Sequence, residues 1–62
     1  LKDIMIILQK SIIFLKKGGK LFLEHAPFHA KKIASISKKV GYKELEQRKD
    51  LNKDIRVSIL TK

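Results

Sequence analysis

A turn of two glycines that leads directly into an apolar run is the feature that most constrains the fold of this chain. Gly18 and Gly19 reach positive φ at little steric cost, so a helix can end there and the chain can reverse. Leu21–Leu23 follows without a polar interruption. A strand with one wet face alternates apolar and polar residues, so an unbroken run predicts a strand that is covered on both faces. Such strands lie inside parallel sheets that carry helices on both sides.

The length of the chain limits how much of such a sheet it can build. Its 62 residues allow one small core, and no cysteine is present to supply a disulfide or a thiolate zinc site. We therefore predict that residues 1–62 are a portion of a larger α/β domain and not a complete domain.

An apolar helix is predicted over residues 1–16. The side chains that recur at spacings of three and four on one face are Leu1, Ile4, Met5, Leu8, Ile12 and Leu15. Further apolar residues widen this face, so we expect the helix to be covered on most of its circumference. Polar residues interrupt the stretch, and it is shorter than the roughly 20 apolar residues of a membrane span. No small-residue cleavage site follows, so the sequence predicts a soluble, cytoplasmic protein.

The pattern after the glycine turn predicts a strand and then an amphipathic helix. Lys20–His25 is the buried strand, Pro27 suits the first turn of the next helix, and Gly41 suits its left-handed end. The apolar face expected for this helix consists of Ala30, Ile33, Ala34, Ser37 and Val40.

Two further strands are expected near the end of the chain. Residues 42–49 are rich in charge, and they form either an edge strand or part of a loop. Asp50–Asp54 is predicted to turn. The last strand alternates apolar and polar residues, and its apolar side is predicted to be Ile55, Val57 and Ile59. Because this strand is the more apolar of the pair, we expect it to lie between Leu21–Glu24 and Lys43–Lys49, antiparallel to its hairpin partner.

The chain is strongly basic, with fifteen Lys and Arg against six Asp and Glu and a formal net charge of +9. An excess of this kind is typical of proteins that bind nucleic acid or an acidic partner. The basic residues are mostly lysines in pairs spread along the chain, which is also the pattern of a solvated surface. Two interpretations stay open: a lysine-rich solvated surface, which the composition favours, and a small basic module that binds RNA or the ribosome.

Candidate site residues gather near the end of the first strand, but their pattern predicts no active site. Glu24 and His25 are neighbours on a strand and point to opposite faces, so they cannot meet at one substrate atom. His25 and His29 have the spacing of a zinc helix, but Pro27 separates them and no third ligand is evident. Gly18–Lys20 precedes a strand, whereas phosphate-binding loops follow one.

Hydroxyl and aromatic residues give no stronger signal. No Gly-x-Ser-x-Gly context surrounds any of Ser11, Ser35, Ser37 and Ser58. A base-stacking platform would need a closer grouping than that of Phe14, Phe22, Phe28 and Tyr42. We therefore predict no catalytic, cofactor-binding or metal-binding residue within this chain.

The predicted order of elements resembles the C-terminal end of the Rossmann-like methyltransferase fold, in which the last strand is antiparallel and inserted one place in from the edge. Leu15–His25 resembles the Leu-x-x-Gly-Gly-x-Leu-x-Leu-Glu-His segment of peptide chain release factor glutamine methyltransferases. The rest of the family's pattern is matched in order and spacing by Val40–Tyr42, Arg48–Leu51 and Arg56-Val57. The resemblance covers nearly the whole chain.

The resemblance implies an enzyme that transfers a methyl group from S-adenosylmethionine to the glutamine amide of the Gly-Gly-Gln motif in release factors. Its glycine-rich cofactor turn and its Asn-Pro-Pro-Tyr motif are not in this sequence and would lie upstream. Residues 1–62 would then be the structural C-terminal portion of the catalytic domain, with the upstream part of the domain as partner. Ala26 and His29 stand where the family often has Gly and Gln, which leaves a neighbouring methyltransferase branch open.

Overall fold

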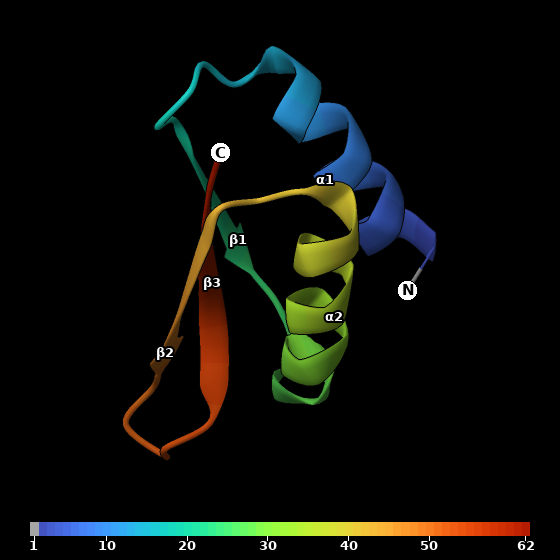
Figure 1. Ribbon diagram of the computed structural model, residues 1–62. Helices are drawn as coiled ribbons and strands as arrows, with labels where there is room; N and C mark the ends of the chain where they lie inside the picture. Colours follow the sequence, from blue (N-terminus) through green and yellow to red (C-terminus); the bar gives the residue numbers. More distant parts are fainter. Residues whose placement is uncertain (1) are drawn as a thin grey trace.

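The computed structural model describes residues 2–62, which form two α-helices on one face of a three-stranded sheet (Figure 1). The elements are α1 (Lys2–Phe14), β1 (Lys20–Glu24), the short 3-10 helix η1 (Pro27–His29), α2 (Ala30–Val40), β2 (Glu44–Lys49) and β3 (Ile55–Thr61). The predicted order of helix, strand, helix, strand and strand is confirmed, and the chain is a small α/β unit. Leu1, which begins the predicted first helix, lies outside the described residues.

The sheet has the strand order β1-β3-β2, and β3 is antiparallel to both of its neighbours. Leu60 of β3 lies opposite Leu21 of β1 and opposite Leu45 of β2. The prediction that the last strand lies between Leu21–Glu24 and Lys43–Lys49 is confirmed. Because β1 and β2 are both antiparallel to β3, they run parallel to each other at the two edges.

One apolar core joins both helices to the sheet. Its buried side chains are Leu8 of α1, Ile33 and Ile36 of α2, Leu60 of β3, and Tyr42 from the segment between α2 and β2. The Tyr42 hydroxyl donates a hydrogen bond of 2.8 Å to the carbonyl oxygen of Leu8, and its burial raises the pKa of this hydroxyl. This bond ties α1 to the segment between α2 and β2.

α1 uses only part of its apolar surface in this core. Leu8 is fully buried, whereas Met5 is 41% exposed although it belongs to the predicted inner face. The outer side carries Ile6, Ile7, Ile13 and Phe14, of which Phe14 is 85% exposed. The helix ends at Phe14 instead of residue 16, and the turn that follows contains Gly18 with φ of 86°. The expected cover on most sides of this helix is not present within residues 2–62.

The prediction that β1 is covered on both faces is wrong for the described part of the chain. Leu21 and Leu23 point toward the helices and are half-buried, whereas Phe22 points to the other face and is 65% exposed. The physical reason is that both helices lie on the same side of the sheet, so an apolar residue on the opposite side meets solvent.

The side of β3 that faces the helices also differs from the prediction. Alternation suggested that Val57 and Ile59 point inward, but Ser58 and Leu60 face the helices. Ile59 is nevertheless only 4% exposed, because neighbouring strands flank it on both sides. A central strand is shielded by its neighbours, so its alternation does not reveal which side carries the helices.

Local signals place the C-terminal end of α2 and the last turn where the sequence predicts them, and the helix expected after Ala26 begins as η1 before α2 starts at Ala30. Pro27 begins η1, and Gly41 ends α2 with φ of 109° while its N–H donates to the Ser37 carbonyl. In the β2–β3 turn the Asp50 carboxylate accepts from the N–H groups of Asn52 and Asp54 and from Arg56. These hydrogen bonds, led by that of Asp54, hold the pKa of Asp50 below its ordinary value.

Candidate functional site

The face of the sheet that points away from the helices carries a mixture of charged and apolar side chains. Three rows cross it, namely Lys20–Thr61–Glu44, Phe22–Ile59–Glu46 and Glu24–Val57–Arg48. Apolar residues therefore lie at the centre, and charged residues lie toward the edges. An ion pair on this face joins Arg48 to Glu46 at 2.8 Å, and both side chains are more than half exposed, so it contributes little stability.

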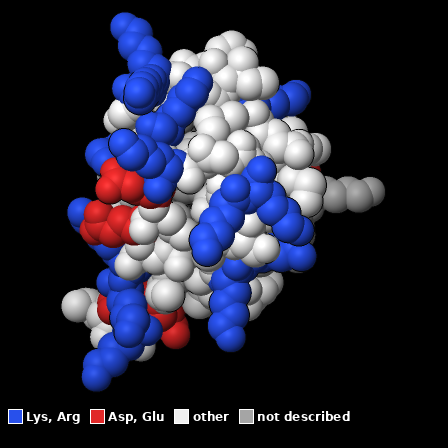
Figure 2. All heavy atoms as spheres, in the orientation of Figure 1, with Lys and Arg blue, Asp and Glu red and all other residues white. Residues whose placement is uncertain are grey.

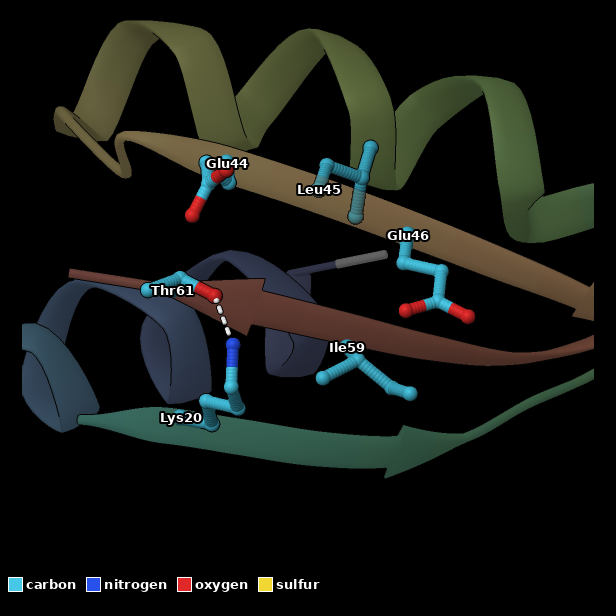
Figure 3. A pocket seen from close by; sticks show the side chains of 6 residues that line it. All are labelled: Lys20, Glu44, Leu45, Glu46, Ile59 and Thr61. Atoms are coloured by element: carbon cyan, nitrogen blue, oxygen red, sulfur yellow. Dashed lines mark hydrogen bonds between the residues drawn. The ribbon is translucent and has the colours of Figure 1, made fainter. Parts of the chain in front are cut away.

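A small hollow lies on this face between β2 and β3, at the level of Lys20 (Figure 3). It has a volume of about 140 Å³ and is lined by Lys20, Glu44, Leu45, Glu46, Ile59 and Thr61. The Lys20 ammonium donates a hydrogen bond of 2.9 Å to the Thr61 hydroxyl, which holds the lysine across the sheet. Sites for organic cofactors usually enclose about 300–1,000 Å³, so this hollow has room for a few water molecules and not for a cofactor.

On the helix side, a polar network joins the residue that follows β1 and side chains of β2 and β3 to the start of α2. The Nε2 atom of His25 lies 2.7 Å from the Ser58 hydroxyl, and the Gln47 amide donates to that hydroxyl at 3.1 Å and to the Ala30 carbonyl at 2.9 Å. The Nδ1 atom of His25 lies 2.8 Å from the Ala26 carbonyl oxygen. Because a carbonyl oxygen only accepts, Nδ1 carries a proton, and in the neutral ring Nε2 accepts from Ser58.

A serine hydroxyl beside a histidine suggests a nucleophile and its base, but this pair cannot reach a substrate. Ser58 has no exposed surface, and its oxygen already accepts from Gln47. A nucleophile must present its oxygen to the substrate. The network instead satisfies buried polar groups and fixes where β1, β2 and α2 meet.

The structure separates the candidate residues that are close in sequence. Glu24 is exposed on the open face, whereas His25 turns to the helix side, so the prediction that they do not converge is confirmed. His29 packs edge-on against Phe28, with ring centroids 4.2 Å apart, and does not join His25. Within residues 2–62, no group of three His, Asp or Glu side chains has the arrangement of a metal site.

The backbone N–H groups of the glycine turn donate hydrogen bonds within the chain. The N–H of Gly18 donates to the Lys62 carbonyl at 2.9 Å, and the N–H of Gly19 donates to the Lys16 carbonyl at 2.7 Å. A phosphate-binding loop needs N–H groups that point at the ligand. The turn therefore connects α1 to β1 and joins the end of the chain to the sheet.

The His25–Ser58–Gln47 network was not evident from the sequence. His25 and Ser58 are 33 positions apart, and nothing local indicates that they meet. Ser37 donates to the Ala34 carbonyl of its own helix. The exposed rings of Phe14, Phe22 and Phe28 lie on three different elements.

Basic side chains concentrate on the outer surface of α2. Lys31, Lys32, Lys38 and Lys39 are all exposed, and α2 contains no acidic residue. Figure 2 shows Lys and Arg across the region of α2, acidic and basic groups mixed near β2, and a largely uncharged surface over α1. The ion pairs found in residues 2–62 join Arg48 to Glu46 and Arg56 to Asp50, so none of these four lysines is neutralised by one.

No protein-family model, curated protein or solved structure matches this chain. Neither helix of the described residues has the length and apolar character that crossing a membrane requires.

Proposed function

We propose that this chain is the C-terminal segment of an S-adenosylmethionine-dependent methyltransferase domain of the kind that modifies release factor glutamine. The observation that carries the proposal is the position of β3, antiparallel between β1 and β2, which are parallel to each other. A parallel sheet that ends in this way is the feature by which the sequence resembles that fold.

The uncovered surfaces of the chain support the same proposal. Three surfaces are apolar and uncovered within residues 2–62: the centre of the free β1 edge, the open face around Phe22 and the outer side of α1. Phe14 and Phe22 are 85% and 65% exposed. In the proposed domain, an upstream strand pairs with β1, and upstream helices cover these side chains.

The residues of this chain do not themselves fit the cofactor. The hollow of about 140 Å³ is too small for S-adenosylmethionine, and the N–H groups of Gly18 and Gly19 donate within the chain. The proposal therefore assigns the cofactor and the substrate amide to upstream residues. This chain supplies the edge of the sheet and two of its covering helices, and it takes no chemical step.

A chimera tests the proposal. In a release factor glutamine methyltransferase, the segment that begins at the helix before the Gly-Gly turn is replaced by residues 1–62. Transfer of a labelled methyl group to a Gly-Gly-Gln peptide is then measured. We expect activity well above that of the truncated enzyme, and loss of activity when Leu60→Asp disrupts the core of the graft.

The outcomes separate the levels of the proposal. A folded chimera that binds the cofactor but does not methylate the peptide would argue against the release factor branch. A chimera that does not fold or bind S-adenosylmethionine, when the enzyme's own segment restores both, would contradict the methyltransferase proposal. The isolated chain is expected to show no binding of the cofactor by calorimetry.

A second candidate function is a small basic module that binds RNA or the ribosome. The observation that favours it is the row of lysines on α2, which lies near the 80% exposed ring of Phe28. Lysines attract phosphates and an exposed ring can stack on a base.

Titration with single-stranded RNA at rising salt tests this second function. The double variant Lys31→Ala/Lys38→Ala should weaken RNA binding and flatten its salt dependence. A control, Lys53→Ala in the β2–β3 turn, should change neither.

A further inference from the structure

β1 is an open edge of the sheet, and its backbone groups alternate between β3 and that edge. Within residues 2–62, β3 is the one strand that pairs with it. The His25 N–H donates to the Arg56 carbonyl, and the Gly19 carbonyl accepts from the Lys62 N–H, both across the β1–β3 ladder. Residues of an antiparallel ladder bond alternately to one side and the other. The backbone groups that face the open edge are therefore those of Lys20, Phe22 and Glu24.

The sequence of β1 is complementary to itself when two copies run in opposite directions. β1 reads Lys-Leu-Phe-Leu-Glu. If two copies pair about Phe22, each Lys20 lies opposite Glu24 of the second copy, and each Leu21 lies opposite Leu23. The residues that face the open edge are the ones that exchange backbone hydrogen bonds in this register. A shift of two residues places Phe22 opposite a charged residue and shortens the ladder.

We propose that two copies of this chain associate through β1, antiparallel and about a two-fold axis at Phe22. The two sheets then form one continuous sheet. The occupant of the open edge is thus a second copy of the chain, and the complementary charges at the ends of β1 set the register.

The side chains around the edge favour this pairing. Phe22 is 65% exposed on the open face, and in the dimer it lies beside its counterpart as an aromatic cross-strand pair. The lysine–glutamate pairs lie at both ends of this aromatic pair. On the helix side, the half-buried Leu21 and Leu23 become neighbours of leucines from the second copy.

The other edge of the sheet is unsuited to the same pairing. The register of β2 shifts between Arg48 and Lys49, and such an irregularity interrupts a ladder. Two copies of β2 centred on Leu45 would place Glu44 opposite Glu46. Centring on Gln47 would place Glu46 opposite Arg48, but the same register sets Leu45 against Lys49, at the irregularity that interrupts the ladder. Like charges directly opposite one another are destabilising. Association through β1 therefore closes as a dimer and does not continue into a fibre.

This inference does not rest on the proposed function. In a longer methyltransferase domain, an upstream strand would occupy the same edge, so the dimer is a property of the 62-residue chain with β1 free. Methylation by the chimera and self-association of this chain are separate measurements, and either can fail alone.

Charge reversal at the two ends of β1 tests the dimer by sedimentation equilibrium in about 150 mM salt, where the Debye length is about 8 Å. Wild type should sediment at twice its 7.2 kDa mass. Lys20→Glu and Glu24→Lys each place like charges opposite one another at both ends of the ladder. Each should raise the dissociation constant of the dimer at least about tenfold. Glu24→Lys is the cleaner variant, because Lys20 also donates to Thr61.

Recombining the two charges makes the test specific for this register. An equal mixture of Lys20→Glu and Glu24→Lys chains should form a heterodimer. The β1 ends of the first variant are both acidic and those of the second are both basic, so opposite charges face each other only in the mixed pair. The double variant Lys20→Glu/Glu24→Lys should again dimerise with itself. Glu44→Lys, which makes the same charge change as Glu24→Lys but on β2, should leave the dimer intact.

Amide hydrogen exchange distinguishes the residues of β1 that bond to β3 from those that face the open edge. The N–H groups of Leu21 and Leu23 bond to β3 and should be protected at every concentration, which also verifies that each variant is folded. Protection of the Phe22 and Glu24 amides should appear only as the dimer forms. A monomeric wild type with rapidly exchanging Phe22 and Glu24 amides would overturn the proposal. A dimer that both single reversals leave intact would overturn it too, and would place the interface elsewhere, for example on α1.

Discussion

β1 and β2 border the same sheet and pair with the same central strand, but they present opposite surfaces to solvent. β1 presents Phe22, with one charge of each sign at its ends and half-buried leucines between. β2 presents Glu44, Glu46 and Arg48 and has an irregular register near its end. Charged side chains and bulges are the features by which sheet edges avoid pairing with other molecules. The β2 edge has both, whereas the β1 edge has a regular register and carries charges only at its two ends.

The two helices differ in the same way as the two edge strands. The outer surface of α2 carries exposed lysines, whereas that of α1 carries exposed isoleucines and Phe14. Residues 2–24, called here the apolar side, therefore expose several large apolar side chains that are suited to association, whereas the exposed side chains of residues 30–56, the charged side, are mostly charged. A single core can support both, because each side contributes only one face to it.

The largest expected effect tests whether the two sides share one core. Leu8 of α1 and Ile33 of α2 have no exposed surface, so Leu8→Ala and Ile33→Ala should each lower the free energy of unfolding by about 2–5 kcal/mol. Urea unfolding at one fixed protein concentration measures both. Leu51→Ala, at a fully exposed position, is the control and should change stability by less than about 0.5 kcal/mol. A much smaller cost at Leu8 would mean that α1 is only loosely attached.

A smaller effect is expected at the two glycines with positive φ, Gly18 in the turn before β1 and Gly41 at the end of α2. Gly18 and Gly41 have φ of 86° and 109°, and an added Cβ would meet no atom within 4 Å at either position. The cost of Gly→Ala is then that of the left-handed backbone, about 1–2 kcal/mol at each site. A synthetic chain with D-alanine at either position should lose no stability. If Gly18→Ala costs much less than Gly41→Ala, the turn into β1 relaxes more readily than the end of α2.

Asp50 makes the stability contributed by the β2–β3 turn depend on acid. Its carboxylate accepts from Asn52, Asp54 and Arg56, and its pKa in the folded chain lies below the ordinary 3.8. A lowered pKa contributes stability that is present above the unfolded value and is lost as the pH falls through the folded one. Asp50→Asn should therefore be less stable than wild type near neutral pH, and the difference should shrink below about pH 3.8. A difference that is constant from neutral pH to pH 2 would contradict the role of the charge.

The smallest effect on folding is expected at exposed apolar positions of α1. Ile13 is 73% exposed, so Ile13→Lys should change the free energy of unfolding by less than about 0.5 kcal/mol. It should raise the concentration at which the chain remains soluble, because it interrupts the apolar surface. The converse change, Lys39→Ile on α2, should lower solubility with an equally small effect on unfolding. A marked loss of stability in Ile13→Lys would show that this side chain is covered.

Patterns that act over a few residues allowed much of this fold to be predicted from the sequence. The spacing of apolar residues indicated both helices, Pro27 indicated where η1 begins ahead of α2, Gly41 indicated the end of α2, and Asp50 indicated the last turn. The position of β3 followed from a comparison of two strands, because the more apolar one belongs at the centre. These features depend on backbone preferences and on burial along a single element, which the order of residues by itself determines.

Only the tertiary structure decided which side of each strand meets the helices and which residues meet across the sheet. Both helices cover the same face, so Phe22 is exposed and Ser58 is buried, although alternation suggested that Ser58 lies outside. The contact of His25 with Ser58 and Gln47 depends on the register of two ladders between distant segments. A shift of one residue would turn every side chain of a strand to the other face, and no local preference records that choice.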